Sequence, residues 1–278
     1  MKPRHSLLIF ALFFALCAAA QKAPAPATKS GDFVIKDFHF QSGEVLPELR
    51  LHYNTLGTPA RSADGKVTNA VLILHGTTGS GKAYLADSFT QAMYGPGQPL
   101  DITRWYIILP DDIGHGQSSK PSDALHAKFP HYDYDDMVEA QYRLVSEGLG
   151  VNHLRLVAGI SMGGMHTWLW GEQHPDFMDA LLPMVSQPVE IAGRNRMWRR
   201  TAADAIRSDP GYNNGDYEKP PAGQIAAARL FAIAVSGDLD LQRRAPTRED
   251  ADRLLDLLAQ RWAQMDANDM LYALESSR

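Results

Sequence analysis

The sequence predicts an α/β fold in which helices cover both faces of a mostly parallel sheet. Strands buried on both faces are expected as short apolar runs without alternation, and helix-length segments are expected between them. Both features are present. The composition of the 278 residues, 45% hydrophobic and 21% charged, excludes a mostly disordered chain. The four apolar runs are residues 70–74 (AVLIL), 106–109 (YIIL), 154–158 (LRLVA) and 180–185 (ALLPMV).

The amino-terminal residues predict a secretory signal peptide over residues 1–20. Lys2 and Arg4 precede an unbroken apolar run that small residues end, so we expect cleavage after Ala20. The run is shorter than the roughly 20 residues of a membrane span, so an uncleaved anchor is the weaker alternative. We therefore expect a secreted or periplasmic protein without a stable membrane span. Residues 21–31, rich in proline and small side chains, predict a disordered tether.

Charge and cysteine content exclude several classes of protein. The formal net charge of −5 gives no support to nucleic-acid binding, because such proteins usually carry a basic surface. Cys17 is the only cysteine and lies inside the predicted signal peptide. A disulfide framework, a cysteine-based zinc site and a thiol nucleophile are therefore excluded in the processed chain.

The predicted α/β core spans residues 32–189. Residues 32–41 and 48–56 are strand candidates, because β-favouring apolar side chains flank a turn that contains glycine and proline. Further along, residues 135–149 carry apolar side chains at helical spacing, and residues 162–173 form a second helix candidate.

The character of the sequence changes after Pro188 and predicts a helical lid over residues 190–278. This part is rich in arginine, aspartate and alanine and shows no strong strand signal. Residues 251–274 predict one long amphipathic helix, because apolar side chains repeat along one face. These side chains are Leu254, Leu258, Trp262 and Met265.

Residues 159–163 (GISMG) match the G-x-S-x-G pattern of a nucleophile elbow. A predicted strand precedes the motif and a predicted helix follows it, which is the context that such an elbow requires. The two glycines leave no Cβ to obstruct a tight strand–helix crossing, and the helix N-terminus favours developing negative charge. Ser161 is therefore the candidate nucleophile, with a purely structural turn as the alternative.

The turn that follows residues 70–74 supplies candidate oxyanion donors. It begins His75-Gly76-Thr77, at the place where an elbow enzyme takes its second backbone donor. The backbone N–H groups of Thr77 and Met162 are the candidates, and a plain glycine-rich turn is the alternative.

Residues 76–83 also fit G-x-x-x-x-G-K, the beginning of the pattern of a phosphate-binding loop. Ala83 stands where a phosphate-binding loop needs Ser or Thr, which disfavours nucleotide binding.

Residues 111–118 (DDIGHGQS) follow another predicted strand and are expected to line a pocket, because ligands of open α/β sheets bind at the carboxyl ends of strands. His115 within this loop is interpreted as structural. Four further residues are possible metal ligands by type, but their spacing is loose, so we interpret them as scattered surface residues. They are Glu48, His52, His126 and His131.

These motifs resemble the α/β-hydrolase superfamily. More narrowly, the chain is similar to the homoserine O-acetyltransferase-like branch, over roughly residues 33–278. The resemblance implies an α/β-hydrolase fold with a helical lid and an acyl-serine intermediate at Ser161. The segments that carry the narrower resemblance are residues 159–165 (GISMGGM), 205–210 (AIRSDP), 215–217 (GDY) and 265–274 (MDANDMLYAL).

A serine nucleophile needs a histidine base oriented by a carboxylate, and in this fold the chain order is serine, acid, histidine. The last histidine is His174, and His166 is the other one after Ser161. Both belong to the predicted helix that follows the serine or to its end, so we expect the triad acid and histidine to be absent from this chain. Three acidic residues are interpreted as solvated charges: Glu190, Asp238 and Asp240.

The expected function is acyl transfer by a serine enzyme, either ester hydrolysis or O-acyl transfer between small molecules. In the superfamily two more strands follow the lid, so we expect the last strands and helices to be missing from a truncated and inactive version. The alternatives are a non-catalytic secreted binding protein and the product of a decayed gene. The sequence implies no cofactor and no metal ion. It leaves the acyl donor, the acceptor and the oligomeric state open.

Overall fold

The computed structural model describes residues 27–277 of the chain. The predicted signal peptide, and residues 21–26 of the predicted tether, lie outside the described residues. None of the described helices combines the length and the apolar composition that a membrane-spanning helix needs.

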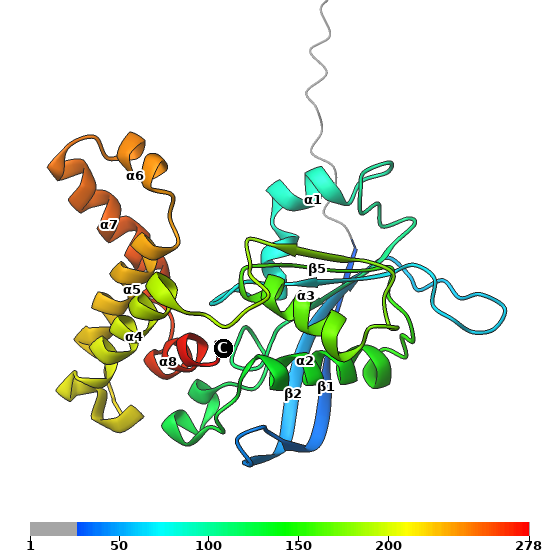
Figure 1. Ribbon diagram of the computed structural model, residues 1–278, viewed down its shortest axis with the longest axis horizontal. Helices are drawn as coiled ribbons and strands as arrows, with labels where there is room; N and C mark the ends of the chain where they lie inside the picture. Colours follow the sequence, from blue (N-terminus) through cyan, green and yellow to red (C-terminus); the bar gives the residue numbers. More distant parts are fainter. Residues whose placement is uncertain (1–26, 278) are drawn as a thin grey trace, which may run out of the picture.

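One sheet of six strands forms the centre of the described chain (Figure 1), in the order β1-β2-β4-β3-β5-β6. β1 and β2 form an antiparallel hairpin, and β2 is also antiparallel to β4. The remaining pairs are parallel, which confirms the predicted mostly parallel sheet. The strands are β1 (Thr28–His39), β2 (Val45–Leu56), β3 (Ala70–Leu74), β4 (Tyr106–Pro110), β5 (Leu156–Ile160) and β6 (Leu181–Met184).

Different helices cover the two faces of the sheet, because successive residues of a strand point to opposite faces. Leu72 and Leu74 of β3 belong to an apolar cluster with side chains of helices α2 and α3. Val71 and Ile73 belong to a second cluster with side chains of helix α1. All residues of β3 and β4 are buried, which explains their unbroken apolar sequences. The helices of the core are α1 (Asp87–Met93), α2 (Tyr134–Arg143) and α3 (Met162–Gln173).

The predicted boundary between tether and core is wrong by four residues. β1 begins at Thr28, which pairs with Leu56, and Gly31 pairs with Tyr53. Residues 28–31 are therefore strand rather than tether. The long partner strand β2 extends the ladder, so that Lys29, Ser30 and Gly31 join it even though such residues are not strand-favouring.

The predicted helix over residues 135–149 begins one residue earlier and changes its geometry at the end. Asp133 caps it, because its carboxylate accepts hydrogen bonds from the backbone N–H groups of Asp135 (2.9 Å) and Asp136 (3.1 Å). The last turn is a π-helix (Leu144–Gly148). Gly150 follows with a φ of +60°.

The residues after β6 form a group of helices beside the α/β core, at the left of Figure 1. We call residues 193–275 the helical unit. Its interior is an apolar cluster that includes buried alanines of α4 and α5. Its helices are α4 (Gly193–Arg207), α5 (Ala222–Ala234), α6 (Asp238–Arg244), α7 (Arg248–Trp262) and α8 (Ala267–Glu275).

The predicted single helix over residues 251–274 is wrong. The chain leaves helix α7 after Trp262, and a new helix, α8, begins at Ala267. Asp266 caps α8, because its carboxylate accepts hydrogen bonds from the N–H groups of Asn268 (2.9 Å) and Asp269 (3.3 Å). An aspartate that can cap a helix start outweighs the apolar periodicity that continues past it. The short helices elsewhere are η1 (Gly81–Leu85), η2 (Pro121–Asp123), η3 (His126–Lys128) and η5 (Pro210–Gly215).

β6 is an edge strand of the described sheet and pairs with β5 alone. Leu182 is 48% exposed and Met184 is 36% exposed. Val185 follows the strand and is also exposed. Among the described residues, β6 therefore forms an open edge of the sheet with exposed apolar side chains.

Candidate functional site

Ser161 lies on a sharp turn between β5 and α3. Its backbone has φ +56° and ψ −117°, a combination that is costly for a residue with a Cβ. The turn is held from both sides, because Ser161 N–H donates to the carbonyl of Met184 (2.9 Å) and its own carbonyl accepts from Met165 N–H (2.9 Å). The side chain is exposed at the carboxyl end of the parallel strands.

Both glycines of the GISMG motif are required by close backbone approaches. A Cβ on Gly159 would lie 2.1 Å from the carbonyl oxygen of Gly163. A Cβ on Gly163 would lie 2.3 Å from the carbonyl oxygen of Leu74, at the end of β3. These distances are far inside van der Waals contact. The strained serine and its glycines therefore have the geometry that the motif predicts for a nucleophile elbow.

The His75-Gly76-Thr77 turn lies directly beside the elbow. A Cβ on Gly76 would lie 3.5 Å from the Cβ of Ser161. The turn is closed by a hydrogen bond from Gly79 N–H to the Gly76 carbonyl (2.9 Å). Of the predicted oxyanion donors, Thr77 follows Gly76 on this turn, and Met162 follows Ser161 at the start of α3.

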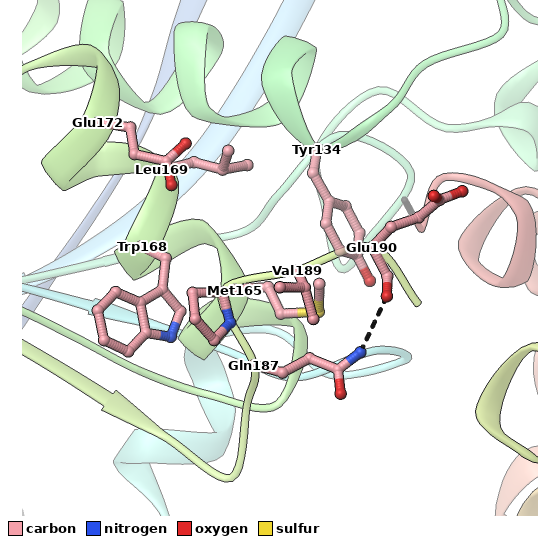
Figure 2. Close-up of a pocket in the computed structure, with 9 residues that line it drawn as sticks. Tyr134, Met165, Trp168, Leu169, Glu172, Gln187, Val189 and Glu190 are labelled. Atoms are coloured by element: carbon pink, nitrogen blue, oxygen red, sulfur yellow. Dashed lines mark hydrogen bonds between the residues drawn. The ribbon is translucent and has the colours of Figure 1, made fainter. Parts of the chain in front are cut away.

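Ser161 lines one pocket, and a second pocket adjoins that one. The first, of about 190 Å³, contains the serine itself between the end of β6 and helix α4. The second, of about 450 Å³, is mainly apolar and shares Tyr134, Met165 and Gln187 with the first (Figure 2). We call them the serine pocket and the apolar pocket. The apolar pocket is further lined by Trp168, Leu169, Glu172, Pro188, Val189 and Glu190.

Arg199 of helix α4 brings a buried positive charge to the serine pocket. It is only 4% exposed, and its Nε donates to Asn195 Oδ1 (3.0 Å). Its Nη2 lies 3.5 Å from Thr77 Oγ1 and its Nη1 lies 3.5 Å from the Leu274 carbonyl. These partners are an amide oxygen, a hydroxyl and a backbone carbonyl, with no carboxylate among them. Burial lowers the pKa of Arg199, and nearby Tyr134 partly offsets this effect.

Arg199 therefore links the helical unit to the turn that carries Thr77. Three features of this arrangement were not found from the sequence: Arg199, Tyr134 and Asn195 as pocket residues. The segment around Arg199 (GRNRMWRR) contains several arginines, and its helical period does not say which of them faces the core. Tyr134 carried no signal other than its position at a helix start.

The loop at residues 111–118 is built around Asp111. Its Oδ1 accepts from Gly81 N–H and its Oδ2 from Gln117 N–H, both at 2.8 Å. A Cβ on Gly116 would lie 2.0 Å from Asp111 Oδ2, which explains the second glycine of the loop. His115 is buried and its Nδ1 lies 2.8 Å from the Ile113 carbonyl. Burial lowers the pKa of His115 to about 4, so it is neutral at physiological pH.

None of the described histidines lines the serine pocket or the apolar pocket. His166 is fully buried in helix α3, and His174 stacks on the ring of Tyr142 with centroids 3.9 Å apart.

The three acidic residues interpreted from the sequence as solvated charges lie apart from Ser161 or at the rim of its neighbouring pocket. Glu190 is exposed and lines the apolar pocket. Asp238 and Asp240 lie on helix α6, where Asp240 pairs with two arginines of its own helix.

The structure disfavours the phosphate-loop alternative. A phosphate-binding loop opens an α-helix, but residues 81–85 form only a short 3₁₀ helix. The Gly81 N–H already donates to Asp111, and Lys82 is exposed.

Within residues 27–277, no three metal-ligating side chains gather in one place. Of the four residues that the sequence offered as metal ligands, His52 is buried rather than on the surface and pairs with Asp32 (2.8 Å), and His131 pairs with Glu44 (3.2 Å).

Comparison with known proteins places this geometry in a family. A family model described as the alpha/beta hydrolase fold matches residues 69–254. The homoserine O-acetyltransferase of Chlorobaculum parvum is 33% identical, over 70% of this chain and 55% of its own length. That of Haloarcula marismortui is 29% identical, over 85% of this chain and 68% of its own length. The chain spans about half the length of most of the curated relatives that it matches.

Solved structures give the same result. The acetyl esterase MekB superposes with a TM-score of 0.76 at 26% identity, covering 90% of this chain and 73% of its own. A homoserine O-acetyltransferase from Bacillus anthracis superposes with a TM-score of 0.78 at 21% identity, covering 90% and 75%. The second likeness shows the fold alone.

Proposed function

The chain belongs to the α/β hydrolase fold family, and from this premise we propose that Ser161 is the nucleophile of an acyl-transfer site. The observation that carries the proposal is the strained backbone of Ser161, held between two glycines that have no room for a side chain. Such strain persists only where the surrounding structure enforces it, and it concentrates at functional sites. An exposed serine beside a pocket has no other evident reason to adopt it.

The chemistry that these residues support is attack on an acyl ester. The Ser161 hydroxyl gives its proton to a base or water as its oxygen adds to the acyl carbonyl carbon, and the carbonyl oxygen becomes an oxyanion. The oxyanion then collapses, the C–O bond to the leaving group breaks, and the leaving oxygen takes up a proton and departs as the alcohol, which leaves an acyl-serine. The N–H groups of Thr77 and Met162 are proposed to receive the oxyanion, with the N-terminus of α3 favouring its charge. Water or a second alcohol then accepts the acyl group, which gives hydrolysis or O-acyl transfer. The names of the relatives, homoserine O-acetyltransferases and an acetyl esterase, support an acetyl or similarly short acyl group.

We further propose that an ester acylates Ser161 of this chain only slowly. A serine hydroxyl loses its proton readily only to a neighbouring base, and general base catalysis typically contributes about 10²–10⁴-fold. No described histidine lines the serine pocket. An added base in solution should therefore restore part of the missing rate.

The test is acylation of the purified chain by p-nitrophenyl acetate, followed by intact mass and peptide mapping. We expect slow addition of one acetyl group at Ser161, accelerated by free imidazole. Reading the protein mass rather than the released nitrophenol matters, because imidazole hydrolyses the ester by itself. Ser161→Ala is the control and should acquire no acetyl group in the active-site peptide. Equal labelling of the Ser161→Ala variant would remove the assignment.

A binding protein without turnover is the second candidate, and the absence of a described histidine from the pocket favours it. It predicts that Ser161 stays unmodified even with imidazole, while an intact acetyl ester binds in the apolar pocket. Trp168 lines that pocket, so binding should change tryptophan fluorescence in the wild-type chain and not in a Trp168→Phe variant. Acylation of Ser161 would decide against this candidate.

Export is proposed on the sequence of residues 1–20 alone. Expression with these residues intact, followed by amino-terminal sequencing of the processed protein, should give a chain that begins at Gln21. A protein that retains Lys2 and Arg4 in the cytoplasm would contradict export.

A further inference from the structure

A set of buried polar side chains joins the turn that carries Thr77 to the helix that follows Ser161. His75 comes from the end of β3, Asp112 from the loop after β4, Gln141 from α2, and His166 and Trp170 from α3. Each is at most 1% exposed. Buried polar groups are costly unless most donors meet an acceptor, so the hydrogen bonds restrict where the protons of this set can lie.

Trp170 determines the orientation of Gln141. The indole Nε1 can only donate, and it donates to Gln141 Oε1 (2.8 Å). The amide nitrogen of Gln141 is therefore on the other side, where it donates to Asp112 Oδ1 and to His166 Nδ1 (3.0 Å). It follows that His166 Nδ1 carries a lone pair and no proton.

His75 is fixed in the same way. The backbone N–H of Asp112 donates to His75 Nε2 (3.1 Å), so this nitrogen also carries a lone pair. The other ring nitrogen, Nδ1, lies 2.9 Å from the Gly76 carbonyl and donates to it. Burial lowers the pKa values of both His75 and His166, in agreement with neutral rings.

The second carboxyl oxygen of Asp112 is then left facing two lone pairs. Asp112 Oδ2 lies 3.5 Å from His75 Nε2 and 3.6 Å from His166 Nδ1, and it is buried without a hydrogen-bond donor. A charged oxygen in this place would be repelled from both sides. A proton on Oδ2 reverses the interaction, because the O–H dipole then points toward the lone pairs.

We infer that Asp112 is a neutral carboxylic acid in the folded protein, protonated on Oδ2, and that it acts as a positioning residue for the loops around Ser161. The neighbouring Asp111 differs from it, because both oxygens of Asp111 accept backbone N–H groups. The two adjacent aspartates of this loop therefore differ in protonation state. Asp111 accepts hydrogen bonds with both oxygens, whereas Asp112 carries a proton on Oδ2.

The electrostatic surroundings agree with this assignment. Burial raises the pKa of Asp112 to about 7, against the weaker lowering effects of His115 and Gln141. Asp111 raises it further. The titratable groups that surround Asp112 are His75 and Tyr84 near the turn after β3, Asp111 and His115 on its own loop, Tyr132 and Tyr134 before and on α2, and His166 on α3.

The first experiment is infrared spectroscopy of the full chain at about pH 5.5, where carboxyl groups with ordinary pKa values of about 4 are ionised. We expect a carbonyl band of a protonated carboxylic acid that is absent from Asp112→Asn and retained in Asp111→Asn. Asp269→Asn is a second control, because burial raises the pKa of Asp269 to about 6 and it contributes to the same region. A wild-type spectrum without a band assignable to Asp112 would overturn the inference.

The second experiment compares folding equilibria as the pH changes. The folded-state pKa of Asp112 lies above its unfolded value of 3.8, so the wild type loses stability as the pH rises from about 4 to about 7. Asparagine has the shape of the protonated acid and no such loss. The folding constant of Asp112→Asn relative to wild type should therefore rise, by up to about tenfold per pH unit, and level off above about pH 7. A ratio that falls with pH would show an ordinary ionised aspartate.

Asp111→Asn is the matched control for stability. It removes an acceptor from a backbone N–H and should be less stable than the wild type at every pH in this range. Should Asp112→Asn not fold, the titration is followed in wild-type chain with ¹³C-labelled aspartate carboxyl groups. A buried carboxyl signal that titrates near pH 7 supports the inference, and its absence contradicts it.

The ionisation state of Asp112 can be tested without any reaction at Ser161. The effect of Asp112 on the position of the Thr77 turn, in contrast, rests on the proposed function. Acylation of Ser161 should decline above about pH 7 in the wild type more than in Asp112→Asn, because deprotonation loosens the turn that carries Thr77. If Ser161 is not acylated at any pH, the proposed function fails while the infrared band still tests the proton on Asp112.

Discussion

The α/β core encloses titratable and polar side chains between its sheet and helices, whereas the ion pairs within the helical unit lie on its surface. In the core, Asp112 and His166 are at most 1% exposed and are linked through Gln141. In the described part of the helical unit, pairs such as Arg200 with Asp204 have side chains that are about half exposed or more. Its interior contains mainly apolar side chains, among them buried alanines.

This difference predicts where substitutions are costly. A polar group that loses its partner in the core stays buried without a substitute, while water replaces a lost partner on the surface of the helical unit. The contacts between the two regions are intermediate, because Arg199 and Asp269 belong to the helical unit but are buried against the core.

The largest expected effect comes from a methyl group added where main chains cross in the core. Gly159→Ala would place a Cβ 2.1 Å from the Gly163 carbonyl oxygen, so we expect a loss of about 3 kcal/mol or more in the free energy of unfolding. Gly237→Ala in the helical unit is the matched control, because no atom lies within 4 Å of the added Cβ. Urea unfolding of both variants measures the contrast. Equal losses would remove the distinction between the two regions.

The next largest effect is expected at the junction. Ser122 donates through its backbone N–H (2.9 Å) and its hydroxyl (2.6 Å) to the carboxylate of Asp269. Ser122→Ala leaves one buried oxygen without a donor and should cost about 1–3 kcal/mol in the free energy of unfolding. Ser62→Ala, which removes an exposed hydroxyl, should leave the unfolding midpoint unchanged.

The cost of Ser122→Ala should depend on pH. Burial raises the pKa of Asp269 to about 6, above its unfolded value of 3.8, so this group stabilises the fold most at low pH and loses that contribution as the pH rises through 6. The hydroxyl of Ser122 lowers the pKa and reduces the loss. Denaturation at several pH values should therefore show a larger penalty above pH 6 than below it. A penalty independent of pH would contradict the role of Ser122.

A smaller and opposite effect is expected at Ser161. Ser161→Gly removes the Cβ from a backbone with φ +56° and should stabilise the chain by about 1 kcal/mol. Ser161→Ala keeps the Cβ and should show no such gain. Thermal and urea unfolding of the two variants separates strain from the loss of the hydroxyl. A glycine variant less stable than the wild type would show that the turn is not strained.

The smallest effect is expected on the surface of the helical unit. Arg200 pairs with Asp204 one helical turn away, with side chains that are 66% and 49% exposed. Arg200→Ala should change the free energy of unfolding by less than about 0.5 kcal/mol, and high salt should reduce the change further. A loss above about 1 kcal/mol would mean that the helical unit depends on its surface charges more than its structure indicates.

Much of the fold was predictable because strong local signals agree with the tertiary structure. The run AVLIL is β3 to the residue, and residues 162–173 are helix α3. Errors occurred where a long-range partner or a cap decides the boundary. β2 recruits residues 28–31 into β1, and Asp266 divides the predicted helix over residues 251–274.

The candidate site likewise contains residues that the sequence predicted and residues that it did not. The G-x-S-x-G pattern and the turn after β3 located Ser161, Met162 and Thr77, because each lies where a short motif follows a strand. Arg199 could not be located, because its burial depends on how α4 packs beside the core. The oxyanion roles and the nucleophile role stay predictions that the experiments above test.

By itself, the sequence determined the order of the six strands, the helices α2 and α3, and the place of the strained serine, since apolar periodicity and paired glycines act over a few residues. Only the tertiary structure decided the proton on Asp112. That proton follows from Trp170, Gln141, His75 and His166, which are distant in the chain and meet in the buried interior of the core. In such a space every lone pair needs a donor, and the balance of donors and acceptors appears only once the chain is folded.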